Sequence, residues 1–200
     1  LLIFFLLGLS TFTKFHYGPA LILSITAVYW CVEKRYRDFQ HALNPLGWLL
    51  WLAPCCLWVW AVASQLPEAW EIWKYELVDR ATGNVGYTTI WFYFRAILWV
   101  TLPWTPVWIL AMRQSWRKAW CEADPKERFL WIWLIVPLTI VTLQPDKHTN
   151  YMLTFLPALS LMAGNYLSRM LTTDQWLSTQ WSKFWGIASL TFNVVLGLAT

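Results

Sequence analysis

The sequence predicts an all-α integral membrane protein, a bundle of about six transmembrane helices that is a fragment of a larger fold. Hydrophobic residues make up 58% of the chain and charged residues only 13%, whereas an ordinary soluble domain has roughly 25% charged residues. The 18 tryptophans are typical of helix ends at a membrane interface. The chain has no initiating methionine and begins and stops within apolar runs, so we expect it to be cut from a longer protein.

Polar breaks divide the chain into segments that fit the length of a transmembrane helix, about 20 mostly apolar residues. Pro19 fits the first turn of the second segment, where its missing N–H costs nothing. Pro103 and Pro106 interrupt the fourth segment, where we expect a kink. We interpret the whole of residues 1–200 as a single multi-span membrane domain. The predicted spans, truncated at the first and the last, are residues 1–12, 18–32, 46–64, 90–112, 129–143, 151–170 and 184–200.

The basic residues indicate the orientation of the bundle. Successive loops alternate between the two sides of the membrane, and the loops of one side carry ten Lys and Arg whereas those of the other carry four. By the positive-inside rule, the side whose loops carry ten Lys and Arg is cytoplasmic. The net charge of +4 is thereby explained by topology and needs no nucleic-acid partner. The cytoplasmic loops are 33–45, 113–128 and 169–183, and the outer loops are 13–18, 65–89 and 144–149.

The longest outer loop, residues 65–89, interleaves Trp70, Trp73 and Tyr75 with charged residues. That pattern is typical of a helix lying along the membrane surface. We therefore predict an outer-face loop with an interfacial helix.

Cationic side chains recur on the outer side. Lys14, Arg80 and Lys147 each lie in a different outer loop, His148 follows Lys147, and Arg95 lies just inside the fourth span. Together they suit an anionic lipid headgroup, because arginine makes forked contacts to phosphate oxygens and lysine acts as a point charge. Taken singly, the lysines also fit ordinary anchors beside a span, and Arg95 fits an arginine that snorkels to the interface.

Glu76 stands four residues before Arg80 and shares a helix face with it. The pair is either a surface salt bridge or an acid that positions the arginine for a phosphate. No glycine-rich phosphate loop, nucleophile elbow or zinc-binding helix occurs in the sequence. We identify no cofactor and can assemble no metal ligands from these residues.

Four segments resemble motifs of the bacterial protein O-mannosyltransferase and aminoarabinose transferase group, the PMT-like and ArnT-like enzymes. They occur in the family's order and at the expected places in the topology, over roughly residues 8–170. In chain order the segments are Thr13-Lys14 before Gly18-Pro19, Glu76-Leu77-Val78-Asp79-Arg80, Trp91-Phe92-Tyr93-Phe94 before Leu102-Pro103-Trp104, and Asp146-Lys147-His148-Thr149-Asn150-Tyr151-Met152-Leu153 before Pro157-Ala158-Leu159.

The resemblance implies the C-terminal part of the membrane domain of a GT-C glycosyltransferase. Such an enzyme moves a sugar, in this group a hexose or a pentose, from a polyprenyl-phosphate carrier to a protein, lipid or glycan acceptor, on the extracytoplasmic face of the bacterial inner membrane. By analogy Lys14, Arg80 and Lys147 would bind the carrier phosphate. Glu76, Arg95, His148 and Tyr151 would support them. The resemblance places the catalytic acidic residue before Leu1, so it is not identified here, and a divalent metal is compatible with the family.

Two other classes remain open. A transporter or flippase for a lipid-linked sugar would also carry a cationic pocket, but it should place ionisable residues near mid-membrane and often contains internal repeats. The second, third, fifth and sixth predicted spans have no charge in their middles. A non-catalytic membrane scaffold is the third class, and nothing in the sequence opposes it.

Overall fold

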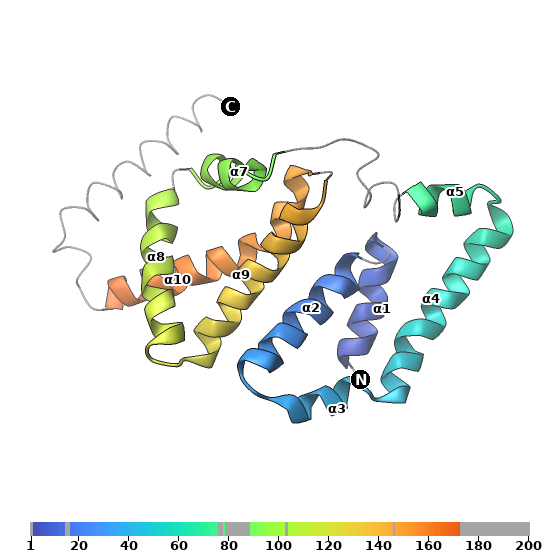
Figure 1. The fold of residues 1–200 in the computed structure, drawn as a ribbon, viewed down its shortest axis with the longest axis horizontal. Coiled ribbons are helices and arrows are strands. Elements are labelled where there is room, and N and C mark those ends of the chain that lie inside the picture. Colours follow the sequence, from blue (N-terminus) through green and yellow to red (C-terminus); the bar gives the residue numbers. More distant parts are fainter. Residues whose placement is uncertain are drawn as a thin grey trace. The chain divides into compact units, whose positions relative to one another are not determined.

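The computed structural model describes residues 2–14, 17–75, 78, 89–102, 104–145 and 147–172. All the regular structure that it describes is helical, which confirms the predicted all-α class (Figure 1). The chain forms two compact units. The first comprises Leu1–Thr89 with Val136–Lys147, and the second comprises Ile90–Ile135 with His148–Thr200.

The first unit is built on helices α1 (Leu2–Lys14), α2 (Tyr17–Val32) and α4 (Pro45–Gln65), with α1 packed against both of the others. The short helices η1 (Tyr36–Asp38) and α3 (Phe39–Ala42) lead from α2 to α4. Helix α4 begins at a proline in its first turn, behind Asn44. The side-chain oxygen of Asn44 accepts hydrogen bonds from the N–H groups of Leu46 and Gly47, at 3.0 and 3.4 Å. These bonds satisfy donors that the helix itself leaves unpaired.

A small residue lets α1 and α4 approach closely. Gly47 of α4 faces the ring of Phe4, and a Cβ at this position would overlap that ring. One turn further along, Trp51 donates its indole N–H to the hydroxyl of Thr11 over 3.0 Å. The same hydroxyl donates to the carbonyl of Leu7 at 2.9 Å. Small residues and interhelical hydrogen bonds are what hold helices together in lipid, where apolar contact alone gives little preference.

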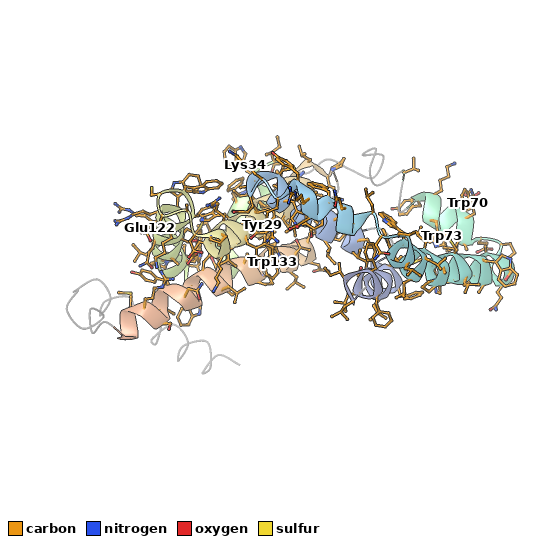
Figure 2. All side chains as sticks on the ribbon, turned by 90° about the horizontal axis from the view of Figure 1, so that it is seen from below. Tyr29, Lys34, Trp70, Trp73, Glu122 and Trp133 are labelled. Atoms are coloured by element: carbon orange, nitrogen blue, oxygen red, sulfur yellow. The ribbon has the colours of Figure 1, made fainter. Side chains whose placement is uncertain are left out.

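Helix α5 (Ala69–Lys74) follows α4 and lies in the segment predicted to contain an interfacial helix. Its Trp73 packs on Trp58 of α4, with ring centroids 6.0 Å apart, whereas Trp70 is exposed (Figure 2). Residues 76, 77 and 79–88 of this segment lie outside the described residues.

The second unit contains α7, α8, η3 and α10, together with most of α9, whose last residues are grouped with the first unit. Helix α10 packs across α8, and η3 contacts both α7 and α10 (Figure 1). The bounds are α7 (Phe92–Val100), α8 (Thr105–Trp120), α9 (Pro125–Leu143), η3 (Thr149–Thr154) and α10 (Leu156–Thr172).

The helix predicted for residues 90–112 is divided into α7 and α8, which meet at a bend in the region where a kink was expected. Thr101 stabilises the end of α7 by donating its hydroxyl to the carbonyl of Ile97, at 2.6 Å. It also accepts the indole N–H of Trp108 of α8 at 2.8 Å.

The prediction that residues 113–128 form a loop is wrong for most of its length. Helix α8 continues to Trp120 and α9 begins at Pro125. Charged residues end an apolar run, but Arg, Lys and Gln are good helix formers, and cations in the last turn complement the helix dipole. Hydropathy therefore marks where a helix leaves an apolar environment, which is not where the helix ends.

Among the described residues, α4 is the one helix that is by itself long and apolar enough to cross a membrane, and α7 with α8 meets the same criterion as a bent pair. Large apolar side chains such as Leu57 and Trp60 of α4 are exposed. Such a surface suits contact with lipid better than contact with water. The count of about six spans stays a prediction.

Candidate functional site

The residues predicted to bind a phosphate divide between the two units and the undescribed part of the chain. Lys14 is the last residue of α1, and its side chain lies outside the described part, as do Glu76 and Arg80 entirely. Lys147 belongs to the first unit. Arg95, His148 and Tyr151 belong to the second.

Lys147 is a buried cation held by backbone. Its residue is only 7% exposed, and its ammonium donates to the carbonyl oxygen of Gln144 at 2.8 Å. Gln144 directly follows Leu143, the last residue of α9. Cations are favoured at such a position, because the last carbonyls of a helix lack partners within the helix and carry partial negative charge. The structure therefore gives this lysine a defined orientation, unlike a lysine that merely stretches toward water beside a span.

His148 and Tyr151 lie together at the start of η3. Their ring centroids are 5.7 Å apart with the planes nearly perpendicular. The carbonyl oxygen of His148 accepts two hydrogen bonds, from the N–H of Tyr151 at 3.1 Å and from the hydroxyl of Tyr93 at 3.2 Å. Tyr93 lies on α7 and is fully buried. The backbone at the start of η3 is thus fixed by a side chain that is 55 residues away in the sequence.

Two further contacts hold η3 and the residue that follows it. Trp133 of α9 donates its indole N–H to the carbonyl of Thr154 at 3.0 Å. Phe155 is fully buried and meets the ring of Tyr93 edge to face. In the sequence, the segment Trp91-Phe92-Tyr93-Phe94 is marked only by its resemblance to a family motif; in the structure, Tyr93 anchors the start of η3.

Arg95 is not brought to this loop. It stands two residues after Tyr93 on α7, and side chains two positions apart on an α-helix point in directions that differ by roughly 200°. Tyr93 faces the interior of the second unit, whereas Arg95 is exposed. The structure therefore joins His148 with Tyr151 and Tyr93, and places Arg95 on the other face of α7.

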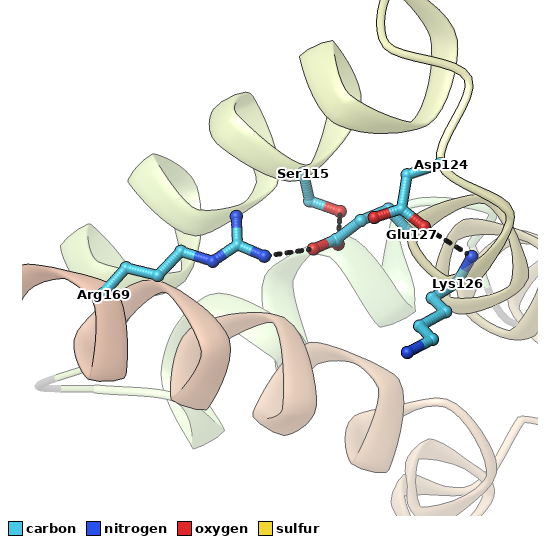
Figure 3. Close-up of polar contacts among 5 residues, drawn as sticks. All are labelled: Ser115, Asp124, Lys126, Glu127 and Arg169. Atoms are coloured by element: carbon cyan, nitrogen blue, oxygen red, sulfur yellow. Dashed lines mark hydrogen bonds and ion pairs between the residues drawn. The ribbon is translucent and has the colours of Figure 1, made fainter.

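A buried carboxylate joins three helices in the second unit, and the sequence analysis did not find it (Figure 3). Glu127 has a side chain only 5% exposed. Its Oε2 accepts a hydrogen bond from the hydroxyl of Ser115 at 2.7 Å, and its Oε1 lies 3.5 Å from a guanidinium nitrogen of Arg169. Ser115 belongs to α8, Glu127 to α9 and Arg169 to α10.

The position of Glu127 follows from how α9 begins. Asp124 precedes Pro125, and its side chain accepts the N–H of Lys126 at 2.9 Å (Figure 3). An Asp before a proline, with Glu three residues after the Asp, is a typical helix start. This sequence pattern could have predicted that Glu127 lies at the start of a helix. It fixes Glu127 in the first turn of a helix whose following residues are almost all apolar.

No group of three or more His, Cys, Asp or Glu side chains that could hold a metal ion occurs among the described residues. The cysteines within that part of the chain, Cys31, Cys55, Cys56 and Cys121, are free thiols.

The chain is similar to curated proteins named undecaprenyl phosphate-alpha-4-amino-4-deoxy-L-arabinose arabinosyl transferase. The protein numbered 2 of that name from Pseudomonas fluorescens (strain Pf0-1) is 26% identical over 196 residues, which is 96% of this chain and 34% of the relative. The protein from Pseudomonas savastanoi pv. phaseolicola is 28% identical over 163 residues, 80% of this chain and 30% of the relative. The protein numbered 2 from Proteus mirabilis is 29% identical over 112 residues, 54% of this chain and 20% of the relative.

No family model matches the chain. No solved structure matches it either. The similarity to the arabinosyl transferases nevertheless confirms the resemblance found in the motifs. The chain is similar to arabinosyl transferases of this name over nearly all of its own length, and it spans about a third of theirs.

Proposed function

We propose that this chain belongs to a membrane glycosyltransferase that moves a sugar from a polyprenyl-phosphate carrier to an acceptor on the outer face of the membrane. The observation that carries the proposal is the similarity over 96% of the chain to relatives named for an undecaprenyl-phosphate donor and for arabinosyl transfer. Because the chain spans about a third of those relatives, the activity proposed is that of a protein of their length.

The proposed reaction exchanges one bond at the anomeric carbon of the sugar. The bond from that carbon to the phosphate oxygen of the carrier breaks, and its electron pair leaves with the lipid phosphate. A nucleophilic oxygen of the acceptor forms the new bond, and its proton passes to a carboxylate that the resemblance places before Leu1. Negative charge grows on the leaving phosphate, so fixed cations aimed at it lower the barrier.

In this proposal Lys14, Arg80 and Lys147 are the cations that hold the carrier phosphate. The defined orientation of Lys147 supports such a role, because a preorganised charge needs no reorganisation during the reaction. Glu76 would position Arg80, and His148 with Tyr151 would shape the adjoining loop, whose backbone is anchored by Tyr93. Arg95, which is exposed on α7, would meet the headgroup at the membrane surface.

The proposed sidedness follows from the basic residues and gains support from the second unit. Arg169, the first residue of the segment 169–183, contacts Glu127 of the segment 113–128. Alternation of loops requires these two segments to share a side of the membrane, and both belong to the lysine- and arginine-rich group. We therefore assign these two segments to the cytoplasm and residues 144–149 to the outer face.

The test is transfer by the complete reading frame that encodes this chain, expressed in membranes of a strain without aminoarabinose transferase. Undecaprenyl-phosphate aminoarabinose is added with a membrane acceptor fraction, and free undecaprenyl phosphate is measured by mass spectrometry. We expect release of the carrier phosphate, and a loss of at least about tenfold in the variant Lys147→Gln, which removes a charge-assisted contact. The matched control is Lys74→Gln, on the exposed surface of α5. If both variants release the carrier phosphate as fast as the parent protein does, Lys147 is not part of the site. If the parent protein releases none, the proposed reaction is refuted.

A further inference from the structure

An open hollow of about 350 Å³ lies between α8 and α10 in the second unit, and its described lining includes no residue assigned to the donor site. Helix α8 contributes most of its lining and α10 contributes Tyr166. The α8 residues that line it are Leu110, Arg113, Gln114, Arg117 and Lys118, and Glu122 stands just beyond the end of the helix (Figure 2 labels Glu122).

The lining of the hollow carries excess positive charge, three cations against one acid. Arg117 lies 3.8 Å from the carboxylate of Glu122, and both side chains are more than half exposed, so this ion pair is weak. Neither Arg113 nor Lys118 has an ion-pair or hydrogen-bond partner for its side chain in the part of the chain that the structure describes. An anion that entered the hollow would therefore meet two cations that give up no protein contact to bind it.

The spacing of the cations along α8 brings their side chains to one face of the helix, at the hollow. Arg113 and Arg117 are four residues apart on α8, as are Gln114 and Lys118, and residues four apart on a helix are neighbours on its surface. The two pairs form adjacent rows that both line the hollow. Gln114 adds an amide donor beside the charges. Forked guanidinium contacts with a neighbouring point charge are the arrangement that suits a phosphate group.

The surroundings place the hollow at the level of lipid headgroups. Helix α8 is mostly apolar up to Met112 and basic from Arg113 onward. Trp116 and Trp120 lie on the same turns as the cations, and each remains about half exposed. Exposed tryptophans are enriched at the membrane–water interface. Leu110 lines the hollow from the apolar part of α8, along which an acyl chain would run.

The two helices that line the hollow, α8 and α10, are packed against each other. Ala111, Ser115 and Ala119 recur every fourth residue on α8, and all three are buried. Small side chains on this face let α10 pack closely on α8. Ser115 also bonds Glu127, which contacts Arg169 of α10 (Figure 3). The cations all lie on α8, and the packing of α8 against α10 is fixed before any ligand arrives, which lowers the cost of binding.

We propose that this hollow binds the phosphate of an anionic phospholipid headgroup, with Arg113 and Lys118 as its main ligands. Basic pockets between helices at the membrane surface are suited to such headgroups. Arg117, already near Glu122, contributes to the field of the site. Its described lining shares no residue with the carrier-phosphate site proposed above, and its occupant is a resident membrane lipid that is not consumed.

The test is lipid binding measured by native mass spectrometry on the purified chain in detergent, with phosphatidylglycerol or phosphatidylcholine added in equal steps. We expect one phosphatidylglycerol to bind at concentrations at which phosphatidylcholine does not. The variant Arg113→Gln/Lys118→Gln should weaken that binding about thirtyfold, the effect of two cations at a membrane surface. The variant Arg113→Lys/Lys118→Arg, which keeps both charges, should retain the preference.

A matched control separates a built site from diffuse attraction. The variant Arg37→Gln/Lys126→Gln removes the same charge from exposed positions outside the hollow, and we expect it to bind phosphatidylglycerol as the parent chain does. Equal weakening in this control would overturn the proposal, because it would show attraction by net charge alone. Complete displacement of the lipid by millimolar inorganic phosphate would also overturn it, because the site would then be one for a free anion. No outcome depends on sugar transfer, so the two proposals fail separately.

Discussion

The contact of Glu127 with Arg169 yields an asymmetric stability prediction. Arg169→Met removes the guanidinium and leaves a carboxylate that is 95% buried with Ser115 as its described hydrogen-bond donor. Glu127→Gln instead removes the charge and keeps an amide oxygen that can still accept from Ser115. In that variant the guanidinium keeps its contact with water, because the side chain of Arg169 is 41% exposed. We therefore expect Arg169→Met to be the more destabilising of the two.

The magnitude follows from the geometry. Removing one partner of a fully buried ion pair costs about 3–5 kcal/mol, because the other charge stays uncompensated. Here Arg169 is partly exposed and its nitrogen is 3.5 Å from the carboxylate, longer than a strong charge-assisted bond. We accordingly expect about 2 kcal/mol for Arg169→Met and about 0.5–1 kcal/mol for Glu127→Gln, the usual range for one net hydrogen bond. The double variant should cost less than the sum of the two, since removing the charge also removes the penalty for leaving it unpaired.

The assay is reversible unfolding of the purified chain in mixed micelles, followed by the fluorescence of its tryptophans as sodium dodecyl sulfate is raised. The control is Arg113→Met, an exposed arginine of α8 that has no described ion pair, and it should change the midpoint by less than about 0.5 kcal/mol. If Glu127→Gln were as costly as Arg169→Met, or if the two costs simply added, the carboxylate would not depend on Arg169 for its charge compensation, and the reasoning would fail.

Four further predictions follow from the packing and from the proposed topology. Gly47→Ala should destabilise the first unit by about 1–2 kcal/mol in the same micelle titration, because overlap with the facing phenylalanine ring outweighs the gain in helix propensity; an unchanged midpoint would contradict the close packing. Tyr93→Phe should cost about 1 kcal/mol through the lost hydrogen bond to the carbonyl of the η3 loop, and the matched change Tyr36→Phe, at an exposed residue of η1, should cost nothing measurable. Arg80→Ala should abolish sugar transfer without lowering the amount of protein in the membrane; normal turnover would exclude this residue from the site. Cysteines placed at Asn84 and Ala123, in a variant whose native cysteines are replaced by serine, should react with an impermeant maleimide from opposite sides of the membrane, and labelling from one side would refute the proposed orientation.

Much of the helical layout could be predicted, because it depends on local patterns. The apolar run that predicts a span at residues 46–64 coincides with α4, and Asn44-Pro45 marks the start of that helix by its own side-chain chemistry. The end of α8 could not be predicted from hydropathy, since Arg113 to Trp120 is polar and still helical. Polarity reports the environment of a side chain, whereas the helix ends only where its backbone hydrogen bonds end.

The candidate site was predictable in its residue types and not in its contacts. Lys147 and His148 stand out as basic residue types in a segment predicted to be an outer loop, but the bond of Lys147 to Gln144 and the anchoring of His148 by Tyr93 depend on where the chain folds back. Glu127 was missed for a related reason. Among the charges of residues 113–128 it has the same pattern as a solvated acid, and its burial becomes visible only when α8 and α10 are placed beside α9.

These contacts separate charges that the positive-inside rule counts alike. Arg113, Lys118 and Arg169 all belong to the loop group that the rule predicts to be cytoplasmic, but Arg169 compensates a buried carboxylate, whereas Arg113 and Lys118 line an open hollow. The rule concerns insertion, which depends on how many basic residues a short loop carries. For these three residues, binding depends instead on whether a carboxylate already pairs with the cation, because a cation in an ion pair gives up that contact to reach a ligand. A lipid headgroup should therefore select Arg113 and Lys118 over equally basic neighbours, and this is why the charge-matched control variant, rather than net charge, decides whether the hollow is a site.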